Sequence, residues 1–392
     1  MNQNTRSWRW LAGALALAAI GAIALYLSPQ ATLRAYLFAW MAMVSIALGS
    51  MSILMLQHLT GGAWGWIIRR PAEAAAMTLP LLALLFVPIA AGLGHLYPWA
   101  DPIVVADHAI LKHRQTFFSI AFVIIRAAVY FAIWIFLAWE LRRLSLAHDE
   151  SGDPGLLLRL RRISAVGFPI YFITMSLASA DWIASLEIDW YSSTFGLLVI
   201  VGQAVSGTTF LILVLQALAA RQRLPDAVEP AHVHDLGNLL LTMVVLWAYI
   251  AFSQFLVIWI GNTQDDMIWY IHRRTGVWGW IGLLLILLYF AVPFALLLFQ
   301  PFKRRLPVLS AIAGGVFAMQ IVHTLWMIAP SSLTDQPGAA HLMDLFALIF
   351  VGGIWLGVFG WLLVRHPLMP LGFRVTVEPL GNDPAGHEQP AA

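Results

Sequence analysis

The chain has 392 residues and a composition that excludes an ordinary soluble domain. Hydrophobic residues make up 60% of it and charged residues only 11%, whereas soluble domains carry roughly 25% charged residues. A net charge of +2 does not indicate a nucleic-acid-binding surface. The chain contains no cysteine, which excludes a thiolate-held iron–sulfur cluster, a thioether-attached haem and a disulfide within it.

Apolar stretches of about 20 residues recur along the chain, the length that a helix needs to cross a bilayer. They are too long and too continuously apolar for barrel strands. We therefore predict an all-α integral membrane protein with about ten transmembrane helices, at residues 9–27, 35–56, 74–95, 116–139, 163–184, 193–219, 236–260, 277–299, 306–329 and 342–364. The first stretch is similar to a signal peptide but is expected to remain as a helix. The polar tail after Pro367 is expected to be disordered.

The distribution of basic residues predicts the orientation of these helices. With the N-terminus inside, 16 of the 22 Lys and Arg residues fall in cytoplasmic segments and five in outer segments, the remaining one being Arg126 within a helix. This asymmetry follows the positive-inside rule. Both termini are therefore predicted to be cytoplasmic.

The chain also contains an internal repeat at an offset of 159 residues. At this offset Leu54-Met-Leu-Gln falls on Leu213-Val-Leu-Gln, His113-Arg on His272-Arg, and Tyr130-Phe-Ala on Tyr289-Phe-Ala. The halves should then have the same orientation and be related by an axis along the membrane normal. We predict four parts: a peripheral helix at 1–34, a first four-helix bundle at 35–191, a second at 192–330, and a second peripheral helix with the tail at 331–392. Gly353 and Gly357 could pack against a neighbouring helix or within the chain.

Arg126 is the most unusual residue because it is a charge within an apolar helix. Counted from Thr116 it lies roughly 15 Å along the helix, and a charge near the midplane costs at least about 2.5 kcal/mol. It must face the protein interior. It is either a fixed charge beside a proton path or a ligand, with Tyr130 one turn further on, or a structural hydrogen-bond centre near the helix kinks at Pro80, Pro88 or Pro169.

His95 and Asp181 are the candidate catalytic residues, as acceptors of the protons of a hydroquinone. Both lie at the predicted outer ends of helices in the first bundle. A carboxylate and an imidazole together can accept and relay two protons. The alternative is that each simply contacts water at the membrane interface.

The other histidines give weaker indications. His323 is expected within the second bundle and His58 at a cytoplasmic helix end, where each is a candidate for a proton path. The alternative for His58, an interfacial histidine without a function, is favoured. No pair of histidines suits a b-type haem, and Asp107, His108 and His113 are too loosely spaced to indicate a metal site. We expect neither a cofactor nor a metal bound by this chain.

Two further runs of residues carry a resemblance to a known family. The motifs Asp181-Trp-Ile-Ala-Ser-Leu-Glu187 and Trp247-Ala-Tyr-Ile-Ala-Phe-Ser-Gln254 resemble those of the large membrane subunits of bacterial alternative complex III, which belong to the NrfD/PsrC-like membrane-anchor family. The likeness extends over nearly the whole chain, and it is greatest to the second of the two paralogues in such complexes.

The resemblance implies a subunit of a quinol:electron acceptor oxidoreductase in the bacterial cytoplasmic membrane. It implies quinol or menaquinol as substrate, with haem and iron–sulfur clusters on partner subunits, namely a multihaem cytochrome c, an iron–sulfur protein and the paralogous membrane subunit. His95 and Asp181 are the positions that could match the family's outer quinol pocket. The chain is therefore expected to be a subunit that takes part in catalysis only within the complex. The alternatives are a scaffold subunit without a ligand and an independent secondary transporter.

Overall fold

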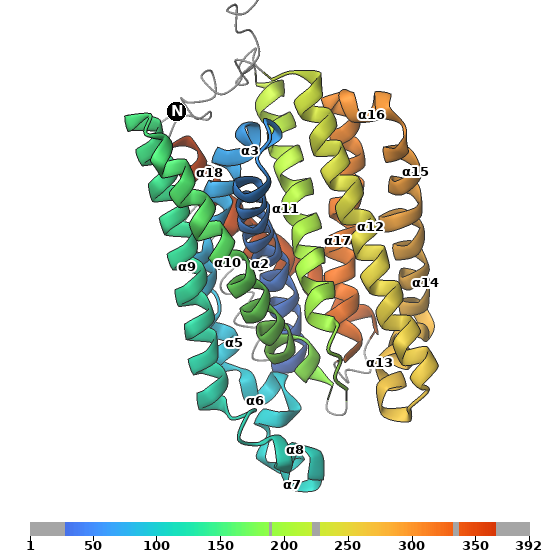
Figure 1. The fold of residues 1–392 in the computed structure, drawn as a ribbon. Coiled ribbons are helices and arrows are strands. Elements are labelled where there is room, and N and C mark those ends of the chain that lie inside the picture. Colours follow the sequence, from blue (N-terminus) through green and yellow to red (C-terminus); the bar gives the residue numbers. More distant parts are fainter. Residues whose placement is uncertain (1–27, 188–189, 222–227, 332–336, 366–392) are drawn as a thin grey trace, which may run out of the picture.

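The described part of the protein is a helical bundle. The computed structural model describes residues 28–187, 190–221, 228–331 and 337–365, and these ranges contain helices but no strand (Figure 1). Nine of the helical segments described are long and apolar enough to cross a membrane. The predicted multi-pass, all-α architecture is confirmed to this extent. The predicted span at 9–27 and the tail after Pro367 lie outside the described residues.

Most of the predicted spans are single long helices, and several extend beyond the predicted bounds. They are α2 (Pro29–Thr60), α9 (Ile120–Ser151), α10 (Pro154–Trp182), α11 (Phe195–Ala220), α12 (Pro230–Gly261), α17 (Leu306–Ile328) and α18 (Pro337–Val364). The extensions arise because helix ends beyond the hydrocarbon region can be polar. α9, for example, continues through Asp149 and Glu150 to a left-handed Gly152 at its C-cap, the usual way in which a helix stops.

Two spans are interrupted. The first consists of α3 (Trp64–Ala76), α4 (Leu79–Leu84), α5 (Val87–Ala91) and α6 (Leu93–Leu96). Pro80 and Pro88 fall in the first turns of α4 and α5, because proline lacks the N–H that would continue the preceding helix. The second consists of α14 (Gly276–Leu284), the π-helical segment η3 (Leu285–Ala291) and α15 (Val292–Leu298).

Short elements lie at the two ends of the bundle. One end, here the α8/α13 end, carries α7 (Pro102–Asp107), α8 (Ala109–Arg114) and α13 (Gln264–Arg274); the other, the α3/α16 end, carries the start of α3 and α16 (Gln300–Arg304) (Figure 1). The 3-10 turns η1 (Pro98–Ala100), η2 (Ala184–Leu186) and η4 (Ala329–Ser331) follow α6, α10 and α17. Because each of these short elements connects two long helices at one end of the bundle, successive long helices run in alternating directions (Figure 1).

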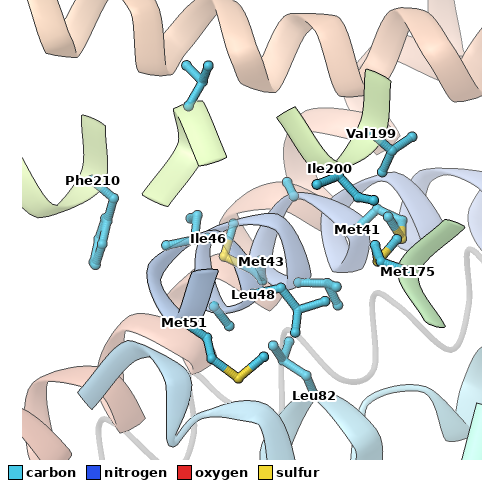
Figure 2. Packing of buried hydrophobic residues seen from close by; sticks show 14 of the residues in the cluster. Met41, Met43, Ile46, Leu48, Met51, Leu82, Met175, Val199, Ile200 and Phe210 are labelled. Atoms are coloured by element: carbon cyan, nitrogen blue, oxygen red, sulfur yellow. The ribbon is translucent and has the colours of Figure 1, made fainter. Parts of the chain in front are cut away.

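The centre of the molecule is the packing of α2 against α11. The apolar core of α2 is buried throughout, and α11 makes the most extensive contact with it. Figure 2 shows Met41 of α2 beside Ile200 of α11 and Met175 of α10, and Leu82 of α4 beside Met51 of α2. The close approach requires glycine: a Cβ on Gly49 would lie 1.8 Å from the backbone oxygen of Gln203.

α18 also packs along α2, on a different side from α11. A buried ion pair joins Arg34 to Asp344 at 3.0 Å, and the Trp355 indole N–H donates to Thr78 Oγ1 at 2.7 Å. Gly353 and Gly357 face away from this contact, with nothing within 4 Å of their added Cβ positions among the described residues. Packing of these two glycines within the described part of the chain is therefore not observed.

Replacing Gly49 with alanine should destabilise the protein because the new methyl group meets the backbone of α11. The cost of such overpacking is about 1–3 kcal/mol. The measurement is thermal unfolding of the purified protein in detergent, with Gly315→Ala on α17 as the control, since nothing lies within 4 Å of that position. Equal melting temperatures for the two variants would contradict the glycine-dependent contact.

Candidate functional site

The centre of the candidate site is a buried ion pair between α9 and α10. Arg126 donates from Nε to Asp181 Oδ2 at 2.9 Å and from Nη2 to Oδ1 at 2.7 Å, the paired geometry in which a guanidinium binds a carboxylate most strongly. Asp181 is completely buried. Arg126 faces the protein interior, as the sequence predicts.

Neighbouring groups complete the coordination of the pair. Tyr130, one turn beyond Arg126, donates its hydroxyl to Asp181 Oδ2 at 3.1 Å. The remaining nitrogen of Arg126, Nη1, donates to the carbonyl of Phe117 at 2.8 Å, and the guanidinium lies 4.0 Å from the centre of the Phe117 ring. Both oxygens of Asp181 are thus occupied by donors.

Local sequence fixes these positions. Ser119 caps α9 by accepting from the Phe122 N–H, so the helix begins at Ile120 and Arg126 lies about 9 Å along it at 1.5 Å per residue. The predicted 15 Å was wrong because it counted from Thr116. α10 ends one residue after Asp181, and the hydroxyl of Ser185 donates to the Asp181 carbonyl at 2.6 Å in the following turn.

The structure does not bring His95 to Asp181. His95 is exposed on α6 and has no hydrogen-bond partner in the described part of the chain, whereas the carboxylate of Asp181 is held by Arg126 and Tyr130. The expected pairing of these two residues is therefore wrong. The kinks at Pro80, Pro88 and Pro169 do not accept from Arg126 either, since its partners are Asp181 and Phe117.

Beside this ion pair, at the α8/α13 end, the structure contains a pocket of about 360 Å³. Its volume is in the range of small-molecule sites. Phe117 and Ser185, which contact the ion pair, are among the residues that line it: Trp99, Leu111, Arg114, Phe117, Phe118, Ala180, Ala184, Ser185, Glu187, Trp190 and Tyr191. Five of these eleven side chains are aromatic, which suits a flat ring between them.

Glu187 supplies the pocket with a carboxylate. Its Oε1 lies 3.1 Å from Nδ1 of His272 and 3.5 Å from Nη1 of Arg273. Glu187 is buried, while the side chain of His272 is 35% exposed. The imidazole therefore connects a carboxylate in the pocket to the surface, an arrangement that can accept a proton and pass it on.

Arg273 anchors this second charged group. Its guanidinium donates to the carbonyls of Trp269, Trp326 and Met327 and to the hydroxyl of Ser331, at distances of 2.6–3.1 Å. It also lies 3.7 Å from the centre of the Trp269 ring. Burial lowers the pKa of Arg273 to about 9, while the charge of Glu187 opposes that shift. The side chain remains cationic at neutral pH and holds the Glu187 loop on α13.

Tyr97 holds the end of α10 next to the ion pair. Its hydroxyl donates to the carbonyl of Trp182 at 2.9 Å. Burial, with a further contribution from the charge of Asp181, raises the pKa of Tyr97 well above its ordinary value. The phenol therefore stays protonated and is a fixed donor.

A second polar cluster lies inside the other half of the chain. His323 of α17, 1% exposed, has its ring centre 5.1 Å from that of Trp247 and 5.9 Å from that of Tyr289, whose hydroxyl donates to Gln320. Both amide atoms of Gln254, Nε1 of Trp247 and Nδ1 of His323 are buried without a partner in the described residues. Such groups are usually satisfied by buried water.

His58 belongs to neither cluster. Its Nδ1 lies 3.0 Å from the hydroxyl of Ser164 at the α3/α16 end. The candidates for a proton path are thus divided between three places: Arg126 and Tyr130 at the ion pair, His323 in the second cluster, and His58 near the opposite end. In the described ranges, no group of three or more His, Asp or Glu side chains could hold a metal ion.

Glu187 and His272 were not predicted as site residues from the sequence, although both lie in sequence motifs that the sequence analysis identified. Glu187 is in the Asp181 motif, and His272 is the repeat counterpart of His113. Their separation of 85 residues gives no local signal that they meet. A comparison with protein-family models and one with curated proteins found no match to the chain.

Replacing Asp181 with asparagine should strongly destabilise the protein, because Arg126 would keep its charge without a buried counter-ion. Breaking such a pair costs about 3–5 kcal/mol. The double variant Arg126→Met with Asp181→Leu should recover most of the loss, because it leaves no buried charge. Thermal unfolding in detergent measures both.

Arg143→Gln is the matched control for this pair, since Arg143 bonds Glu140 on the same helix but its side chain is 54% exposed. Its unfolding should be nearly unchanged, as exposed ion pairs contribute little. If Asp181→Asn melts like Arg143→Gln, the ion pair does not hold α9 to α10.

Proposed function

We propose that this chain is a membrane-embedded subunit of a bacterial quinol:electron acceptor oxidoreductase, and that its aromatic pocket at the α8/α13 end binds the quinol head group. The observation that carries the proposal is the combination, in one pocket, of flat aromatic walls with the buried carboxylate of Glu187 and the partly exposed imidazole of His272. The family resemblance of the Asp181 and Trp247 motifs agrees with it.

The chemistry needs two proton acceptors and an electron acceptor. Oxidation of a hydroquinone to the quinone releases two protons and two electrons. In the proposal Glu187 takes the protons of the two ring hydroxyls in turn and passes each to His272, which conveys it to the surface. The electrons pass to haem or iron–sulfur groups on partner subunits, and the chain itself, without cysteine, is not an autonomous enzyme.

The proposed partners are a multihaem cytochrome c, an iron–sulfur protein and a paralogous membrane subunit. The positive-inside distribution supports an orientation in which the α8/α13 end faces outward from the bacterial cytoplasmic membrane. Quinol would then release its protons on the outer side. The partners that carry electrons would dock over the same face.

We further propose that the chain is duplicated, with α2 and α11 as equivalent helices at the centre. The packing of these two helices on one another and the similar positions of α8 and α13 at one end support this. The broken α3–α6 run corresponds to the continuous α12, and the continuous α9 to α14, η3 and α15. Equivalent helices have thus kept their order but not their local form.

A scaffold role in the same complex is the second candidate function. It is favoured by the Asp181 carboxylate, because both of its oxygens already accept hydrogen bonds from Arg126 or Tyr130 and the group is held as a structural counter-ion. On this interpretation the ion pair shapes the bundle and the neighbouring pocket is unused. A proton path through His323 or His58 remains compatible with either role.

Identification of the copurifying subunits is the first test. The tagged chain, solubilised in mild detergent, should retain a multihaem cytochrome and an iron–sulfur protein, which mass spectrometry and a haem spectrum detect. Recovery of the chain alone, with solute uptake activity in liposomes, would instead identify an independent transporter.

In the isolated complex, Glu187→Gln should lower quinol oxidation by roughly 10²-fold or more, the usual contribution of a general base. His272→Gln should have a smaller effect, because water can replace a relay at the surface. Turnover with a soluble quinol and an artificial electron acceptor gives the rates. The control is His95→Gln, an exposed histidine without a partner among the described residues, and a larger loss in that variant than in Glu187→Gln would refute the assignment of the pocket.

A further inference from the structure

At the α3/α16 end, far from the pocket, basic side chains outnumber the acids that could neutralise them. Arg70 of α3 binds Glu73 at 2.5 Å and also forms an ion pair with Asp149 of α9. One arginine therefore engages both carboxylates. The other arginines of the cluster are left without an acidic partner.

Arg69 is the most deeply buried of these. It is 2% exposed, and its guanidinium lies 4.0 Å from the Trp66 ring centre and 3.4 Å from the amide oxygen of Gln57. Its Nε and Nη1 atoms are buried and have no hydrogen-bond partner in the described residues. A buried guanidinium in this state is costly unless an anion or water reaches it.

Arg142 and Arg365 add to the excess of positive charge, and both are more exposed than Arg69. Arg142 of α9 is half-buried, and its Nη1 likewise has no partner within the described ranges. Its electrostatic neighbours are Glu73, Arg70 and Arg365. Arg365, exposed just after α18, lies 3.5 Å above the Trp361 ring and forms no ion pair with any described acid.

We propose that Arg142 and Arg365, beside the buried Arg69-Arg70 pair, are a binding site for a phosphate group, carried by the head group of an anionic phospholipid or present as free phosphate. Guanidinium groups match phosphate oxygens through paired hydrogen bonds. Basic pockets between transmembrane helices at this depth bind anionic head groups. Trp139, an exposed residue one turn nearer the bilayer centre on the same face of α9 as Arg142, provides an apolar surface for the acyl chains.

The site is distinct from the proposed quinol pocket and does not depend on it. The two lie at opposite ends of the bundle (Figure 1). The other charged groups of the cluster, Glu73 and Asp149, are already paired with Arg70, so they do not cancel the charge that remains.

The test compares lipid binding by the full chain and by the double variant Arg142→Gln with Arg365→Gln. Delipidated protein in detergent is titrated with phosphatidylglycerol or phosphatidylcholine, and bound lipid is counted by native mass spectrometry alongside the melting temperature. We expect phosphatidylglycerol to bind in preference and to raise the melting temperature. The double variant should bind it roughly tenfold more weakly, the loss of about one charge-assisted hydrogen bond.

The control removes two charges at the same end, Arg143→Gln with Arg161→Gln, and should leave the preference intact. A third titration uses inorganic phosphate: protection by phosphate alone assigns the site to the free anion, and protection only by phosphatidylglycerol assigns it to the lipid. Equal binding of both lipids with no effect of phosphate, or equal losses in the two double variants, overturns the proposal. If the double variant does not fold, Arg365→Gln alone, at an exposed position, should still weaken phosphatidylglycerol binding, and unchanged binding would be an equally clear refutation.

Discussion

The need to neutralise charge inside a lipid-facing helical bundle is the constraint on which this structure depends. Three arginine side chains are buried near the α8/α13 end, and each forms an ion pair with a carboxylate from another segment. The pairs are Arg126 with Asp181, Arg273 with Glu187, and Arg34 with Asp344. An unpaired charge there would cost several kcal/mol. The pairs therefore fix which helices are neighbours, joining α9 to α10, the loop after η2 to α13, and α2 to α18.

The pocket follows from two of these pairs. The first holds Phe117 on its side of the pocket, because Arg126 binds the Phe117 carbonyl; the second holds Glu187 on the other side, through Arg273. A pocket bounded by two ion pairs is rigid at its polar edges, while its aromatic walls come from loops and short helices. This is an arrangement in which a ring can be bound and its hydroxyl groups oriented.

Much of the fold could be predicted from the sequence because membrane spans depend on length and apolar composition, which are local properties. The interruptions at Pro80 and Pro88 are local too, but hydropathy does not reveal where a helix restarts. The partners of the charges could not be predicted. α9 is apolar on all sides around Arg126, so its pattern indicates that Arg126 turns inward but not that Asp181, 55 residues away, receives it. His95 seemed the better partner only because depth along a helix does not specify its rotation.

The two halves predicted from the sequence repeat also differ in charge, and the difference bears on where proton chemistry could occur. At the 159-residue offset, Tyr130 corresponds to Tyr289 and Arg126 to Leu285. Tyr130 donates to a carboxylate, whereas Tyr289 donates to the neutral amide of Gln320. The groups around His323 are uncharged, and Arg273 of the predicted second half binds Glu187 of the predicted first half instead. Fixed positive charge from both predicted halves, on Arg126 and Arg273, thus stabilises the carboxylates beside the pocket, and a substrate that loses protons would be better served there than beside His323.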